Sequence, residues 1–219
     1  MSYIVAIDGP AGSGKGTITK IISDKLGIVS VDTGAMYRCV ALYMLENDIK
    51  LDEIDKIKEM LSSINIKLDK ENVYLNDKIV TKEIRTKEVN DFVSQVSHVV
   101  EIRNGMVDLQ RKMGENCNII LEGRDIGTNV FPNAEVKIYL DAAPEERAKR
   151  RYRQNIEKGI NDVTYEEILA NVIMRDTNDK TSSVAPLKKA DDAIVIDSTN
   201  MSIDEVANKV IDLIKEKVL

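Results

Sequence analysis

Five short apolar runs recur along the chain, each rich in β-branched side chains and separated from the next by polar stretches. They cover residues 3–7, 28–31, 118–121, 136–140 and 193–196. Short, predominantly apolar runs of four or five residues are typical of strands that are buried on both faces of a parallel sheet. Each run therefore predicts one strand of a buried, five-stranded sheet.

Helical patterns lie between these runs. Thr164 and Ser202 are each followed three residues later by a glutamate, the spacing of a capping box at a helix start. Pro144 with two glutamates behind it also suits the first turn of a helix. Because strands and helices alternate, the pattern predicts an α/β fold in which helices flank a parallel sheet.

One stretch departs from this alternation. Residues 64–80 hold three short apolar segments separated by polar turns, which predicts a small antiparallel meander. Residues 86–113 follow with a helical apolar spacing, and we expect this helix to break near Gly105. The stretch reads as an insertion into the α/β domain.

Composition narrows the class of protein. The chain has 219 residues, a net charge of −6 and 43% hydrophobic residues, which suits one globular domain with excursions. No apolar window approaches the ~18 residues of a membrane span, and no basic flank typical of a signal peptide is present. Two cysteines and a single histidine, His98, argue against a disulfide framework and a histidine metal cluster. We expect a cytoplasmic protein that does not bind membranes.

A glycine-rich loop follows the first predicted strand and leads into a helix. Such a loop points backbone N–H groups at a polyphosphate, and Lys15 at its end adds a mobile positive charge for the outer phosphates. The alternative is a tight glycine turn without a ligand. The loop predicts an ATP site made of Gly9, Pro10, Ala11, Gly12, Ser13, Gly14, Lys15, Gly16 and Thr17.

The residue after Lys15 is Gly16, so the hydroxyl that usually binds magnesium in such loops is missing. We therefore expect Mg²⁺ to be held through water, the phosphates and a nearby carboxylate. Asp32 and Glu122 both follow predicted core strands and are the candidates. The alternatives are a helix cap for Asp32 and an ion pair with a lysine for Glu122.

Residues 147–153 place five positive charges within seven positions of a negatively charged protein. Phosphoryl transfer between nucleotides needs a movable cluster of this kind, and Arg147 and Arg151 share a helix face. The alternatives are a solvated helix face or a nucleic-acid surface. Because the chain is acidic overall and Tyr152 alone lies among these charges, we expect no nucleic-acid partner.

Several segments together resemble the bacterial-type cytidylate kinases, a branch of the nucleoside monophosphate kinases. The loop from Gly9 to Thr17 ends in the lysine–glycine–threonine order typical of these kinases, and further matching segments are spread over nearly the whole chain. They are residues 32–38, 83–86, 94–96, 122–127, 175–179 and 185–187.

The resemblance implies a transferase that moves the γ-phosphoryl group of ATP to CMP or dCMP with Mg²⁺, in pyrimidine nucleotide metabolism. It implies that Thr33, Arg38 and Arg124 face the acceptor phosphate. It implies that Ser94, Arg103 and Asp125 read the cytosine, and that Arg175 and Asp179 hold the sugar and phosphate. We expect the catalytic residues to be Lys15, Arg124, Arg147 and Arg151.

The same resemblance implies three regions in one P-loop kinase domain. The core comprises residues 1–36, 103–146 and 186–219, the inserted monophosphate-binding region residues 37–102, and a short helical lid residues 147–185. We expect a monomer. Two positions depart from the family, since Glu122 replaces an aspartate and Ser182 replaces a lid arginine. A P-loop kinase for another small acceptor, and a nucleotide-binding switch, remain as alternatives.

Overall fold

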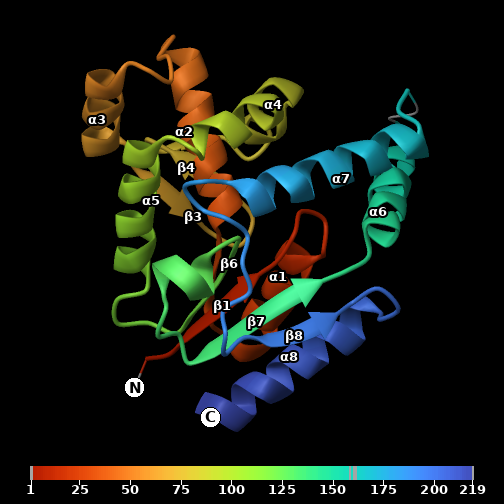
Figure 1. The fold of residues 1–219 in the computed structure, drawn as a ribbon. Helices are drawn as coiled ribbons and strands as arrows, with labels where there is room; N and C mark the ends of the chain where they lie inside the picture. The colour runs from red at the N-terminus through yellow and green to blue at the C-terminus, as the bar shows by residue number, and fades with distance from the viewer. Residues whose placement is uncertain (1, 158, 160–161, 219) are drawn as a thin grey trace. The chain divides into compact units, whose positions relative to one another are not determined.

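The computed structural model describes residues 2–157, 159 and 162–218 (Figure 1). The chain divides into two compact units, which are described separately. The first comprises Met1–Val29 with Cys117–Leu219, and the second comprises Ser30–Asn116. The predicted division into core, inserted region and lid stays a prediction.

A five-stranded sheet forms the centre of the fold (Figure 1). Its strands, in spatial order, are β2 (Val29–Asp32), β6 (Ile119–Gly123), β1 (Ile4–Asp8), β7 (Val136–Asp141) and β8 (Ile194–Asp197). Strand β1 pairs in parallel with β6 and with β7, and β7 pairs in parallel with β8. The five-stranded parallel sheet predicted from the apolar runs is confirmed.

Helices α1 (Lys15–Leu26) and α8 (Ile203–Val218) pack together on one face of this sheet. Ile22 of α1 and Val210 of α8 are fully buried in a cluster with Ile7 and Ile138 of the central strands. Burying a side chain of this size stabilises the fold by about 1.5–3 kcal/mol. This core holds the carboxyl end of β1, and with it the glycine loop.

Two helices follow β7: α6 (Pro144–Glu157) and α7 (Tyr165–Thr181). The predicted capping box at the start of α7 is confirmed, because Thr164 and Glu167 satisfy each other's backbone N–H groups. The two helices bury Ala148, Ile168 and Val172 against one another. This small separate core holds α6 and α7 together as a pair.

The second unit carries the predicted meander. Strand β4 (Val73–Leu75) pairs antiparallel with β3 (Ile66–Leu68) and with β5 (Lys78–Ile79), so the meander is confirmed. The helices of this unit are α2 (Thr33–Glu46), α3 (Ile54–Ser63), α4 (Lys87–Val96) and α5 (Val100–Met113), with a 3-10 turn at Glu83–Arg85.

The predicted helix break at Gly105 is wrong. The helical stretch breaks between α4 and α5, and Gly105 lies inside α5. A Cβ atom at Gly105 would stand 3.0 Å from a methyl group of Leu61, which belongs to the neighbouring helix α3. The glycine therefore permits close helix packing rather than ending a helix.

Along the described part of the chain, no helix is both long enough and apolar enough to cross a membrane.

Candidate functional site

The glycine loop leaves the carboxyl end of β1 through a backbone that only glycine adopts easily. Gly9 has a φ of 153°, and a Cβ atom there would stand 2.1 Å from the carbonyl oxygen of Leu140 on the neighbouring strand β7. Any side chain would push the loop away from the sheet. The strand–loop–helix context predicted for an ATP site is present, because α1 begins at Lys15.

The Lys15 side chain is folded back under this loop and is buried. Its Nζ donates hydrogen bonds to the carbonyl oxygens of Gly9 and Pro10, both at 2.8 Å. Burial, together with the positive charge of Arg124, lowers the pKa of Lys15 to about 7, against the opposing effect of the Glu122 and Asp8 carboxylates. A polyphosphate bound at the loop would restore the fully charged ammonium group.

Arg124 directly follows β6, whose carboxyl end pairs with that of β1, and its positive charge lowers the pKa of Lys15. Its Nε donates to Oδ2 of Asp179 on α7 at 2.7 Å, and both side chains are only partly exposed. Two of the residues predicted to bind substrate are therefore joined directly. Their pairing also links the loop after β6 to α7.

Asp125 comes next and begins a five-residue π-helical turn, Ile126–Val130. Its carboxylate is largely buried and accepts a hydrogen bond from Nδ2 of Asn129 at 3.0 Å. The backbone behind it is held by Asp8, whose two carboxylate oxygens accept the N–H groups of Ile126 and Gly127. Burial raises the pKa of Asp8 to about 6, against the opposing effect of these two hydrogen bonds.

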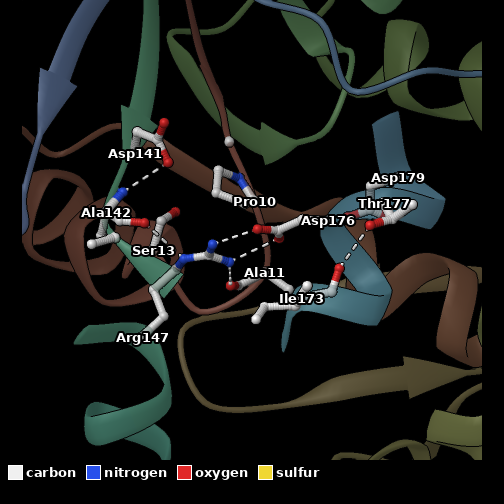
Figure 2. Close-up of polar contacts among 12 residues, drawn as sticks. Pro10, Ala11, Ser13, Asp141, Ala142, Arg147, Ile173, Asp176, Thr177 and Asp179 are labelled. Carbon is white, nitrogen blue, oxygen red and sulfur yellow. Dashed lines mark hydrogen bonds and ion pairs between the residues drawn. The ribbon is translucent and has the colours of Figure 1, made fainter. Parts of the chain in front are cut away.

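Arg147 is buried and held from three sides, as Figure 2 shows. Its guanidinium donates to both carboxylate oxygens of Asp176 on α7, at 2.9 and 2.5 Å. It also donates to the carbonyl oxygens of Ala142 at 2.8 Å and of Ala11 in the glycine loop at 3.0 Å. A contact between Arg147 and a transferred phosphate would require this guanidinium to exchange Asp176 for the phosphate.

The other predicted lid residues differ in their exposure. Arg151 is exposed to solvent on α6, and Arg175 is partly exposed on α7. Ser182 caps the end of α7, where its Oγ accepts the N–H group of Ala185 at 3.2 Å. Arg150 is tied to the loop after β8, since it donates to the carbonyl oxygen of Ser198 at 2.7 Å.

The second unit holds the other predicted acceptor residues. Nε of Arg38 on α2 donates to Oδ1 of Asn90 on α4 at 3.3 Å, and Thr33 is buried at the start of α2. Ser94 is exposed on α4, and Arg103 is buried on α5. Asp125 belongs to the first unit, so the convergence of Ser94, Arg103 and Asp125 on one base stays a prediction.

Asp32 serves as a helix cap, the alternative considered from its sequence position. Its Oδ1 accepts the N–H group of Ala35 at 2.9 Å at the start of α2.

Glu122 lies beside the glycine loop. A Cβ atom at Gly16 would stand 2.9 Å from Oε1 of Glu122, so this carboxylate occupies the space where loops with serine or threonine carry a hydroxyl. Among the described residues, no three histidine, cysteine or carboxylate side chains gather as a ready-made metal site.

Comparison with known proteins identifies the family. The family model described as cytidylate kinase matches residues 5–216. This chain belongs to the cytidylate kinase family. A cytidylate kinase of Fusobacterium nucleatum is 51% identical over 207 residues, covering 94% of each chain. A cytidylate kinase of Bacillus subtilis is 43% identical over 217 residues, covering 97% of this chain and 96% of the relative.

A solved structure of an uncharacterized protein from Eubacterium ventriosum shares the fold with a TM-score of 0.54. It is 14% identical in sequence, and the match covers 98% of this chain and 99% of that one. The family resemblance stated from the sequence motifs is therefore confirmed, and so is the prediction of a kinase. These matches do not favour the alternative of a nucleotide-binding switch or of a kinase for another acceptor.

Three residues of the site were not predicted from the sequence: Asp8, Asn129 and Asp176 as a partner of Arg147. Asp8 gave the clearest signal, because it ends a core strand directly before the glycine loop. The same argument had been applied to Asp32 and Glu122. Asp176 lies in a segment that carries the family resemblance, but its pairing with Arg147 gave no local signal, since pairing a residue on α7 with an arginine on α6 requires the packing of both helices.

Replacing Ser182 with arginine is expected to lower the KM for CMP about tenfold, because a charged hydrogen bond to a phosphate contributes roughly 1.5–3 kcal/mol. Steady-state kinetics with CMP as the varied substrate measure this effect. Ser182→Gln is the matched control, since it adds length and polarity without charge. Equal behaviour of the two variants would show that no lid charge is missing at this position.

Proposed function

We propose that this protein transfers the γ-phosphoryl group of ATP to CMP or dCMP, giving ADP and CDP or dCDP. The observation that carries the proposal is the placement of two cations after the paired carboxyl ends of β1 and β6. Lys15 comes from the loop after β1, and Arg124 comes from the loop after β6. A phosphoryl group in transfer bears negative charge on its equatorial oxygens. It is therefore stabilised by positively charged side chains on both of its sides.

The chemistry needs little else from the protein. The phosphate of a nucleoside monophosphate is already an anion, so the reaction requires no general base. Lys15 binds the outer phosphates of ATP, and Arg124, already oriented by Asp179, binds the acceptor phosphate. Arg151 is exposed on α6, and we assign it to the closing lid, where it would reach the phosphates and help to exclude water.

We assign the remaining acceptor contacts by family membership. Thr33 and Arg38 hold the phosphate, and Arg175 and Asp179 hold the sugar and phosphate region. Asp125 with Ser94 and Arg103 reads the cytosine. The buried carboxylate of Asp125 matches the exocyclic amino group of cytosine, which is a hydrogen-bond donor.

We assign the magnesium ion to the edge of the loop beside Gly16. The Glu122 carboxylate stands there, and carboxylate oxygens, phosphates and water are the ligands that Mg²⁺ prefers. When bound, Mg²⁺ supplies neutralisation of the charge on the outer phosphates. Asp32 is left to its role as the cap of α2.

An acceptor panel tests the proposed function. ADP release from ATP is measured with CMP, dCMP, UMP, AMP, GMP or a small hydroxy acid, and without any acceptor. We expect turnover with CMP and dCMP only. Release of ADP at the same rate with and without CMP would contradict the proposal and favour a slow nucleotide hydrolase.

We further propose that the enzyme works as a cytoplasmic monomer.

Replacing Glu122 with glutamine is expected to raise the Mg²⁺ concentration needed for half-maximal turnover about tenfold, because an amide is a weaker ligand for this ion than a carboxylate. The measurement is a Mg²⁺ titration of turnover at saturating ATP and CMP. Glu122→Asp is the matched control, since it keeps the charge and restores the residue usual in the family. A titration midpoint that Glu122→Gln leaves unchanged would remove Glu122 from the metal site.

A further inference from the structure

The buried carboxylate of Asp8 joins two loops that are far apart in sequence. Asp8 is the last residue of β1 and directly precedes the glycine loop; its exposed fraction is 4%. Its Oδ1 accepts the N–H group of Ile126 at 2.8 Å, and its Oδ2 accepts the N–H group of Gly127 at 2.7 Å. Each oxygen has its own donor, so the carboxylate is held in one orientation.

The two N–H groups that Asp8 binds follow directly after Asp125. On the far side of the turn, the N–H groups of Asn129 and Val130 donate back to the carbonyl oxygen of Asp125, at 2.9 and 3.2 Å. The Asn129 side chain also donates to the Asp125 carboxylate. Asp125 therefore lies in a turn that is closed on itself and anchored from outside by Asp8.

The contact between Asp8 and the turn leaves little space for a side chain at residue 127. A Cβ atom at Gly127 would stand 3.3 Å from Oδ2 of Asp8 and 3.3 Å from Cδ of Lys137. The backbone of the turn thus lies directly against the Asp8 carboxylate, because residue 127 has no side chain. A buried carboxylate is costly unless its hydrogen bonds are made, so these two bonds offset part of that cost.

We propose that Asp8 is a positioning residue for the acceptor site, which holds the Arg124–Asp125 segment at a fixed place relative to the glycine loop. Asp8 belongs to the strand that carries this loop, and it binds the backbone that carries Asp125. The inference rests on the proposed function, because that function gives Arg124 and Asp125 their contacts with CMP.

Asp8→Asn tests this role with almost no change in size. The amide keeps one acceptor oxygen but turns its NH₂ group toward the second N–H donor, so one hydrogen bond is lost. We expect the KM for CMP to rise at least ~10-fold, while the KM for ATP changes less than ~3-fold. We also expect the ratio of kcat/KM for CMP over UMP to fall. A merely structural role would raise both KM values together or change neither.

Asp141→Asn is the matched control. Asp141 ends the neighbouring strand β7, and its Oδ1 accepts the backbone N–H group of Ala142. An amide oxygen makes the same bond, so we expect the KM for CMP to stay within about twofold of the wild-type value.

Gly127→Ala perturbs the contact between Asp8 and the turn from the side of the turn, and it tests the proposal if Asp8→Asn does not fold. It should raise the KM for CMP in preference to that for ATP.

The double variant Asp8→Asn, Asp125→Asn tests whether Asp8 acts through Asp125. If it does, the CMP/UMP ratio of the double variant equals that of Asp125→Asn alone, because the two changes remove one shared interaction. Independent, multiplying effects on the ratio would overturn the proposal. Its failure is distinct from failure of the proposed function, since the latter shows as a wild-type protein that does not phosphorylate CMP.

Discussion

Lys15→Ala is expected to lower kcat at least ~10²-fold, the scale of losing one charge partner of the transition state. The Lys15 ammonium donates to the loop carbonyls of Gly9 and Pro10 in the free protein, so it already lies under the glycine loop. A bound polyphosphate replaces these neutral partners with anionic ones. The gain in hydrogen-bond strength then stabilises the charge that develops on the transferred group.

The measurement is turnover at saturating ATP, CMP and Mg²⁺, with thermal unfolding as the control for folding. Since burial disfavours the charged form of Lys15, the wild-type protein gains little stability from this side chain, and we expect a similar melting temperature for the variant. A folded Lys15→Ala protein with near-normal turnover would contradict the assignment of residues 9–17 to ATP.

Asp125→Asn is expected to weaken the use of CMP and to reduce the preference for CMP over UMP at least ~10-fold. Cytosine presents an amino donor where uracil presents a carbonyl oxygen. A carboxylate accepts from the former and leaves the latter unpaired, whereas an amide can present either a donor or an acceptor. Burial of Asp125 strengthens this discrimination, because water cannot replace the missing partner.

The ratio of kcat/KM for CMP and UMP in the wild-type and variant proteins measures this effect. The KM for ATP is an internal control and should stay nearly unchanged. An unaltered CMP/UMP ratio in an active variant would show that Asp125 does not read the base. The family match would then remain, but another residue would have to account for the selectivity.

The strands were the most predictable part of the fold, because all five apolar runs became strands of the parallel sheet, with ends that differ by no more than two residues. The expected burial on both faces is wrong for the edge strands β2 and β8, where Val29 and Val195 are exposed because, among the described residues, no strand covers the outer side of either one. Helix starts with local hydrogen bonds were also predictable. Thr164 with Glu167 and Ser202 with Glu205 both form the bonds that their spacing indicates.

Features that depend on contacts between distant residues were predicted less well. Gly105 was expected to end a helix, but it provides space for Leu61 of another helix. The apolar spacing after Thr164 predicts Ile173 on the same helix face as Val172, yet Ile173 is 49% exposed, whereas Val172 is buried. A periodic pattern does not determine which residues at the border of an apolar helix face are buried. Their burial depends on the position of the neighbouring helix.

The sequence by itself determined the order of strands and helices and the glycine loop with Lys15, because these depend on short segments whose side chains fix the local backbone conformation. It also determined the family, because the matching motifs are themselves short segments of sequence. The tertiary structure decided which charges meet. Arg147 and Arg151 share a helix face, yet Arg147 is buried against Asp176 while Arg151 is exposed. Asp8 likewise became a partner of Ile126 and Gly127 only because β1 and β6 are neighbours in the sheet. Charge pairs and buried hydrogen bonds join residues across the chain, so their free energies depend on distances that no local pattern contains.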